Sequence, residues 1–335
     1  MKTYKCLWTI LFCLMIVVNT AGCFTSKPYK ETQFLMDTII EITAYGPNDE
    51  AATKAAFNEF KRIQAISDRY NADSQISKIN QMAGISPVAV DRDLVKMVND
   101  SIAISQKMDG AFDISIGSLT ELWGVGHKGD FVPTQEEIDQ VLPLVNYRLI
   151  QVDAEKGTVY LPKAGMKLDL GGVAKDYAIN KAVEILKAQG IKSALVNAGG
   201  DIQVIGNKPD GTPWRIGVQD PRNTDGVIAK LSLTEWNTLQ TSGDYQRFFI
   251  KNGVRYAHIL DPKTGRQPVE TASVTLVYKD TAIYNGGDIA SSGFLVLGPE
   301  KGMEALKQFP GVEAVFVLSD GRIIVSPGLK NKVEL

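Results

Sequence analysis

The sequence predicts an α+β fold with mixed, largely antiparallel sheets and flanking helices. Strand-like segments follow one another through most of the chain after residue 190, whereas segments with helical spacing of apolar residues are few. Short turns that contain glycine, such as Lys251-Asn252-Gly253, join several of these segments. A doubly wound nucleotide-binding fold would need regular alternation of strands and helices, and this sequence does not alternate in that way.

The chain begins with the pattern of an export signal. Two lysines precede an apolar run over residues 7–18, and small residues follow it. The run is shorter than the roughly 20 residues that a membrane-spanning helix needs. Thr20-Ala21-Gly22-Cys23 resembles a lipobox, so we expect residues 1–22 to be a lipoprotein signal peptide and Cys23 to carry lipid. An ordinary cleaved signal and a retained anchor are the alternatives.

Composition limits the classes of function. The 3 cysteines are Cys6, Cys13 and Cys23, so a domain without the signal has no disulfide framework. With 36 basic and 38 acidic residues the chain has no electrostatic signature of nucleic-acid binding. We expect an exported, lipid-anchored protein with a polar tether over residues 23–32 and one domain over residues 33–335.

The expected elements follow from the spacing of apolar residues and from turn residues. Residues 36–45 alternate as a strand does and end at Gly46. Asn48 or Asp49 is expected to cap a helix that ends near Ser67. Further helices are expected over residues 93–108 and 175–189, the second ended by Gly190, and a hairpin over residues 147–152 and 158–161. The remaining strands are predicted over residues 193–196, 203–205, 214–218, 228–233, 237–241, 246–251, 273–278 and 312–318.

One glycine-bearing segment leads directly into a helix. Asp169 is followed by Gly171 and Gly172, and Lys175 opens the helix. Free backbone N–H groups and the helix dipole favour an anion at such a point, and glycines permit its close approach. A buried loop with Lys175 in solvent is the alternative. Residues 197–201, NAGGD, are interpreted as a tight turn between strands, with a turn that cradles phosphate as the alternative.

A second candidate segment places a carboxylate near hydroxyl groups. Asp288 lies three and four residues before Ser291 and Ser292, so a helix from residue 289 to 297 would bring these groups to one face. Oxygen ligands of this kind suit a hard ion such as Mg²⁺. Asp288 as a helix cap is the alternative.

The chain has 2 histidines, and they differ in setting. His258 precedes the polar turn that begins at Asp261, whereas His127 lies in a glycine-rich loop and is expected to be exposed. An ordinary pKa of about 6.5 makes His258 a candidate for proton transfer.

Seven motifs in a fixed order resemble a known family. They are Met36-Asp37-Thr38, DRYNADSQISKIN (68–80), GAFDISIGSLTELWG (110–124), DLGGVAKDYA (169–178), NAGGD (197–201), TSGDYQRFF (241–249) and HILDPKTG (258–265). In these the chain resembles the ApbE family, the FAD:protein FMN transferases, from about residue 36 to about residue 298. The resemblance implies an ApbE-like, T-fold-like architecture.

The resemblance also implies a site. Its flavin-binding residues would be Met36, Tyr70, Ala111, Phe112, Asp113, Asp169, Lys175 and Leu260. Its metal ligands would be the Gly172 carbonyl and the side chains of Asp288, Ser292 and Ser291. The family commonly has Thr where Ser292 stands, and Ser keeps the hydroxyl oxygen but loses the methyl that restricts its rotamer.

The implied reaction is Mg²⁺-dependent transfer of FMN from FAD to a Thr or Ser hydroxyl of an acceptor protein, with release of AMP. His258 would position or deprotonate that hydroxyl, and Asp261 would either orient His258 or hold its own turn. The family implies flavin-carrying subunits of membrane redox complexes as acceptors. Hydrolysis of FAD to FMN and AMP is one alternative, and a non-catalytic flavin-binding lipoprotein is the other.

Overall fold

The computed structural model describes residues 27–279 and 289–335. The predicted signal peptide, Cys23 and Asp288 lie outside the described residues. Within the described part of the chain, none of the helices has the length and apolar character needed to cross a membrane.

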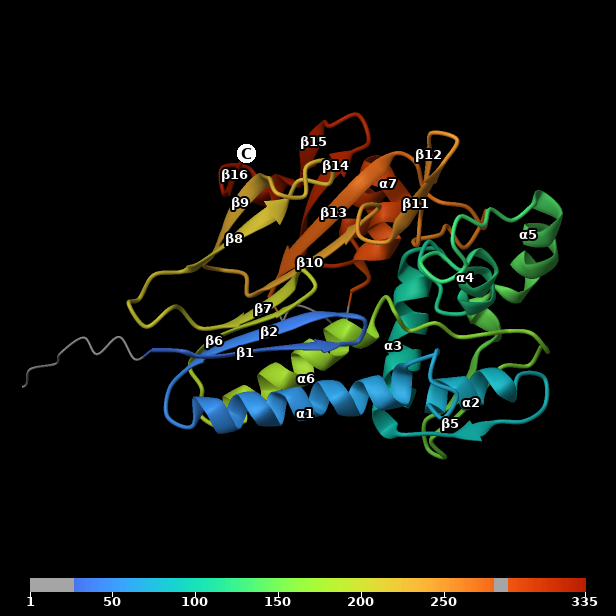
Figure 1. The fold of residues 1–335 in the computed structure, drawn as a ribbon, viewed down its shortest axis with the longest axis horizontal. Helices are drawn as coiled ribbons and strands as arrows, with labels where there is room; N and C mark the ends of the chain where they lie inside the picture. Colours follow the sequence, from blue (N-terminus) through green and yellow to red (C-terminus); the bar gives the residue numbers. More distant parts are fainter. Residues whose placement is uncertain (1–26, 280–288) are drawn as a thin grey trace, which may run out of the picture.

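An eight-stranded antiparallel sheet forms the centre of the molecule (Figure 1). Its strands, in spatial order, are β1 (Tyr29–Leu35), β2 (Thr38–Tyr45), β6 (Ser193–Ala198), β7 (Asp201–Ile205), β10 (Thr238–Gly243), β13 (Thr271–Tyr278), β14 (Glu313–Leu318) and β15 (Ile323–Val325). All seven neighbouring pairs are antiparallel, which confirms the expected fold class.

Three smaller sheets accompany it. They are β16 (Val333–Glu334), β9 (Val227–Leu233) and β8 (Trp214–Gln219); β3 (Val88–Ala89), β5 (Thr158–Tyr160) and β4 (Gln151–Asp153); and the hairpin β11 (Phe248–Lys251) and β12 (Val254–Ala257). The turn of that hairpin is Asn252-Gly253, with both residues at positive φ, which matches the twist of two antiparallel strands.

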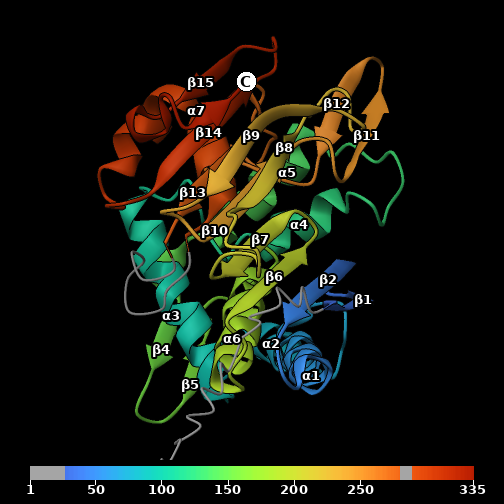
Figure 2. The same cartoon turned by 90° about the vertical axis from the view of Figure 1, so that its left-hand side faces the viewer.

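Helices flank the sheets. The helices are α1 (Asp49–Ser67), α2 (Gln75–Gln81), α3 (Arg92–Lys107), α4 (Gly117–Trp123), α5 (Gln135–Val141), α6 (Ala174–Ala188) and α7 (Ser291–Leu306), the last interrupted at Gly298. Figures 1 and 2 show α1 and α6 side by side on one face of the large sheet, and β8 and β9 beyond its other face.

Three groups of buried apolar residues stabilise this arrangement. The largest lies between the sheet and α1, α3, α6 and α7, and it includes Phe60, Leu186 and Phe294. A second group, which includes Trp214 and Val277, joins the large sheet to β8 and β9. The third packs α4 and α5 against Leu260.

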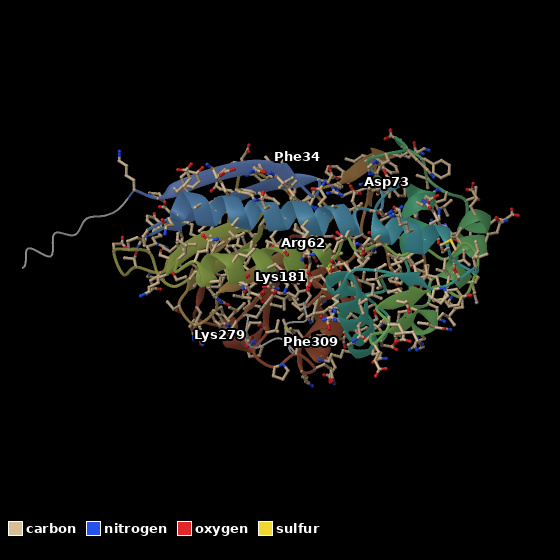
Figure 3. The ribbon with its side chains drawn as sticks, turned by 90° about the horizontal axis from the view of Figure 1, so that it is seen from below. Phe34, Arg62, Asp73, Lys181, Lys279 and Phe309 are labelled. Atoms are coloured by element: carbon tan, nitrogen blue, oxygen red, sulfur yellow. The ribbon has the colours of Figure 1, made fainter. Side chains whose placement is uncertain are left out.

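Charged groups also tie the helices together. Arg62 of α1 pairs with Glu59 and Asp93, and Lys181 of α6 lies 4.0 Å from Asp93 (Figure 3). The Tyr177 hydroxyl donates to the same Asp93 carboxylate at 2.6 Å. This network joins α1, α3 and α6, and of its residues Tyr177 belongs to the DLGGVAKDYA motif.

Three predictions of local structure need correction. The tether does not extend to residue 32, because Tyr29–Leu35 pair with β2 as an edge strand. The first strand of the predicted 147–161 hairpin is shorter, because residues 147–149 form a 3₁₀ turn that Asn146 caps. Asn48 precedes α1 as predicted, yet it does so in a left-handed conformation with no cap hydrogen bond from its side chain.

Candidate functional site

A cavity of about 580 Å³ opens where the end of the β1–β2 hairpin meets the segment after α1, the turn before α6 and the start of α7. All eight residues of the implied flavin site line it, and so do His258, Gly172, Ser291 and Ser292. Asp261 is not part of the lining. The fold therefore brings together in one cavity residues that range from Phe34 to Val296 in the sequence. The roles of these residues stay predictions.

Asp169 forms a buried ion pair at the inner wall. Its Oδ2 accepts from Arg69 Nη1 at 2.6 Å and from Thr120 Oγ1 at 2.9 Å, and its Oδ1 accepts from the Gly171 N–H at 2.9 Å. Burial raises the pKa of Asp169, but Arg69 and these donors outweigh it and hold the pKa below its usual value. Asp169 therefore fixes the glycine turn before α6 in its ionised form.

Lys175 is also paired and is not left in solvent. Its ammonium forms an ion pair with Asp201 and donates to the Ala198 carbonyl at 3.1 Å. Burial lowers the pKa of Lys175, yet the neighbouring carboxylates of Asp201 and Asp176 more than compensate and raise it. Asp201 also accepts from the Thr241 N–H at 2.7 Å. The NAGGD turn thus contributes a carboxylate to the cavity beyond its role as a connection.

His258 lies in the cavity wall with its ring near a backbone carbonyl. Its Nδ1 is 3.3 Å from the Arg247 oxygen. A carbonyl only accepts, so this contact assigns the proton to Nδ1 and leaves the Nε2 lone pair available. Burial and the Arg247 charge lower the pKa of His258 to about 4, so the ring is neutral at physiological pH.

Asp261 holds the turn that follows. Its carboxylate accepts from the Lys263 N–H at 2.8 Å and from the Thr264 hydroxyl at 3.1 Å. Among the described residues, the ring contact found for His258 is with Arg247. The role of Asp261 stays a prediction.

The glycine turn approaches the start of α7 closely. A Cβ on Gly172 would lie 3.2 Å from the Phe112 ring and 3.4 Å from Ser292 Oγ. Ser291 Oγ shares a hydrogen bond of 2.8 Å with Ser242 Oγ of β10. The two segments predicted to share a metal are therefore neighbours. Asp288, which was predicted as a ligand from the second segment, lies outside the described residues.

Other predicted residues shape the walls. Both oxygens of the buried Asp113 carboxylate are used within the protein, by Ser115 and by the Tyr147 N–H, and burial raises its pKa. The Tyr70 and His127 rings lie in contact at an interplanar angle of 37°, with centroids 4.4 Å apart, and His127 is exposed as expected. Tyr70 thus stands at the mouth, and Asp113 supports the wall.

Sequence reasoning missed several lining residues. Arg69, Asp201 and Arg247 lie inside the quoted motifs, but no spacing rule linked them to their partners. The lining contains six aspartates (Asp37, Asp68, Asp113, Asp169, Asp176 and Asp201) and three Lys or Arg residues (Arg69, Lys175 and Arg247). Each of the three cations has a carboxylate partner: Asp169, Asp201 and Asp37.

The chain is similar to known proteins over nearly its whole length. The family model described as "ApbE family" matches residues 36–316. A protein of Treponema pallidum named FAD:protein FMN transferase is 30% identical over 100% of this chain and 98% of its own. One of Klebsiella pneumoniae with the same name is 34% identical, with 90% and 92% covered.

Solved structures agree with the sequence relatives. The ApbE protein of Thermotoga maritima has a TM-score of 0.82 at 33% identity, over 91% of this chain and 99% of its own. The flavin transferase ApbE of Vibrio cholerae has a TM-score of 0.78 at 25% identity, with the same coverage. On the family match, the identity of its relatives and the shared fold, this chain belongs to the ApbE family.

Proposed function

We propose that this protein is an enzyme that transfers FMN from FAD to a Thr or Ser hydroxyl of an acceptor protein, in a reaction that depends on Mg²⁺. The oxygen of the acceptor forms a bond to the phosphorus nearest the flavin, the phosphoanhydride bond breaks, and AMP leaves. The names of the relatives support the reaction class. The cavity supports it because its volume and mixed lining suit a dinucleotide.

The main support for the proposed dependence on Mg²⁺ is the charge of the side chains that line the cavity. Six aspartates face three cations, and each of these cations is already paired with a carboxylate. Such a wall repels the two phosphates of FAD unless a further cation is present. Among the described residues no three His, Cys, Asp or Glu side chains form a metal cluster. Mg²⁺ binds few protein ligands and keeps waters and substrate phosphates.

The groups that would hold the ion are oxygen donors. They are the Gly172 carbonyl, the Ser292 and Ser291 hydroxyls, and the Asp288 carboxylate. When bound, Mg²⁺ would neutralise phosphate charge and stabilise the charge that develops on AMP. Gly172 suits its place because a side chain there would meet Phe112 and Ser292.

His258 would accept the proton of the attacking hydroxyl. Its ring is neutral and its Nε2 lone pair is available, because Nδ1 faces the Arg247 carbonyl. A base with a pKa near 4 is deprotonated at all physiological pH values but is weak. We therefore assign it mainly to orienting the hydroxyl and to taking its proton as the new P–O bond forms.

The test measures products with and without an acceptor. The purified protein is incubated with FAD and Mg²⁺ alone, or with a co-expressed acceptor whose mass is then determined. An added FMN mass on a single Thr or Ser, together with AMP, is expected. AMP without an acceptor, at an equal rate, would support hydrolysis, and bound flavin without AMP would leave a flavin-binding protein.

The metal site has its own test. Asp288→Ala should lose at least about 100-fold in AMP release, as expected for an oxygen ligand of a catalytic cation, while the thermal midpoint changes little. EDTA should have the same effect on the unmodified protein, with recovery on added Mg²⁺. Full activity of the variant would exclude this metal site.

We also propose export and lipid attachment at Cys23, with membrane flavoprotein subunits as acceptors. The support is the residue pattern of positions 1–23. Cys23→Ser should move the protein from the membrane fraction to the soluble fraction, and an unchanged distribution would contradict the anchor.

A further inference from the structure

The turn that joins β1 to β2 is held in an unfavourable conformation. Met36 and Asp37 have φ of 52° and 58°, in the left-handed region. Glycine and asparagine are the residues that usually occupy both positions of such a hairpin turn, because a Cβ makes this region costly. Consecutive non-glycine residues keep it only where their surroundings hold them. Both residues line the cavity.

Two contacts from distant segments hold this turn. The Gln64 side-chain carbonyl, near the end of α1, accepts from the Met36 N–H at 2.9 Å. Arg247, which lies just before β11, donates from Nη2 to the Asp37 carbonyl oxygen at 3.1 Å. The same Arg247 nitrogen lies 3.0 Å from the Asp37 carboxylate. Arg247 therefore clamps the turn through both a backbone and a side-chain oxygen.

The backbone of Arg247 contacts the other functional wall. Its carbonyl oxygen accepts from the His258 N–H at 3.0 Å and faces His258 Nδ1 at 3.3 Å. One residue thus touches the turn at one end of the cavity with its guanidinium. It touches the candidate proton acceptor with its carbonyl.

We propose that Arg247 is a positioning residue that couples the Met36-Asp37 turn to the orientation of His258. Movement of the turn, when a ligand contacts Met36, is transmitted through the Arg247 side chain to the carbonyl that fixes the His258 ring. The catalytic meaning of this coupling rests on the proposed function, whereas the coupling itself is a property of the protein without substrate.

The charged groups that face His258 come from three segments. Arg247 and Lys175 of α6 lower its pKa, and Asp169, in the turn before α6, raises it. Removal of the Arg247 charge should therefore let the His258 pKa rise from about 4 toward its ordinary value of about 6.5. A replacement that keeps a positive charge should leave the pKa low.

The test uses NMR titration of the two histidine rings in the purified full-length protein without FAD. The His127→Asn variant assigns the two signals. Arg247→Gln should raise the His258 pKa and shift its ring nitrogen signals toward a mixture of tautomers, while Arg247→Lys should keep the pKa low. Arg222→Gln is the matched control, because Arg222 pairs with Asp244 at 2.6 Å but does not line the cavity.

Kinetics supply the second measurement. Arg247→Gln should raise KM for FAD and lower kcat, each by roughly 10-fold, because both the turn and the base lose their support. An unchanged His258 pKa and unchanged kinetic constants in Arg247→Gln would overturn the proposal, whatever its effect on the thermal midpoint. A shifted pKa in a protein that transfers no FMN would retain the coupling and reject the transferase function instead.

Discussion

The inner wall of the cavity and its rim use the same kind of ion pair in different surroundings. At the inner wall, the Arg69 and Asp169 side chains are 10% and 18% exposed, and those of Lys175 and Asp201 are 22% and 5% exposed. At the rim, those of Arg247 and Asp37 are 43% and 60% exposed. A buried pair is costly to break, whereas an exposed pair contributes little. We therefore expect the inner wall of the cavity to be more rigid than its rim.

Among the substitutions that test this difference between wall and rim, Arg69→Ala should have the largest effect on stability. It leaves the Asp169 carboxylate buried with two neutral donors, so the free energy of unfolding should fall by about 3–5 kcal/mol. Denaturant unfolding measures the loss. Lys156→Ala, which removes an exposed pair with Asp153, serves as the control and should have no measurable effect. A loss for Arg69→Ala as small as that of the control would mean that the inner wall is not rigid.

Asp201→Asn should have the next largest effect. The amide oxygen can still accept from the Thr241 N–H, but Lys175 loses its carboxylate. The expected loss of unfolding free energy is about 1–3 kcal/mol. The same variant makes the lining less acidic, so FAD binding without Mg²⁺ should improve in a fluorescence titration. Unchanged binding would argue against the charge argument for the metal.

His258→Gln tests the wall through pH. The folded pKa of His258 is about 4, below the value of about 6.5 expected for the unfolded chain. The contribution of the neutral His258 ring to the free energy of unfolding is therefore complete above about pH 6.5, and it is lost as the pH falls toward 4. The thermal midpoint of the unmodified protein should decline more steeply over this window than that of His258→Gln. Parallel curves would mean that the ring titrates normally.

Asp37→Gly probes the rim and should change stability least. The glycine adopts positive φ freely, and the loss of the exposed carboxylate costs at most about 1 kcal/mol. The thermal midpoint should stay level or rise, while KM for FAD increases because the turn is no longer held through the side chain. A destabilisation as large as that of Arg69→Ala would remove the distinction between wall and rim.

Local patterns were sufficient for much of the fold. The helical spacing of apolar residues predicted α1 between Asp49 and Ser67, because one face of that helix is buried. Lys251-Asn252-Gly253 was recognised as a turn after a strand, whereas β12 on its far side was not predicted. Tyr29–Leu35 was not recognised as a strand, because polar residues occupy both of its faces and leave no apolar alternation to detect. Its assignment depends on backbone pairing with β2.

The residues of the candidate site, too, could be predicted from the sequence only in part. Gly172, Lys175 and His258 were identified from motifs, since each motif is a continuous run of residues. The long-range ion pairs of the cavity were not identified, because Arg69 is 100 positions from Asp169 and Arg247 is 210 positions from Asp37. A single sequence has no signal for contacts between segments that lie so far apart.

The sequence alone determined the fold class, most elements and the family resemblance, because periodicity, turn residues and contiguous motifs are properties of short segments. The tertiary structure decided which charges meet, which of them are buried, and that Asp261 holds a turn while the Arg247 carbonyl fixes the His258 ring. Burial and pairing depend on how distant segments pack, and they set the strength of every charge in the cavity.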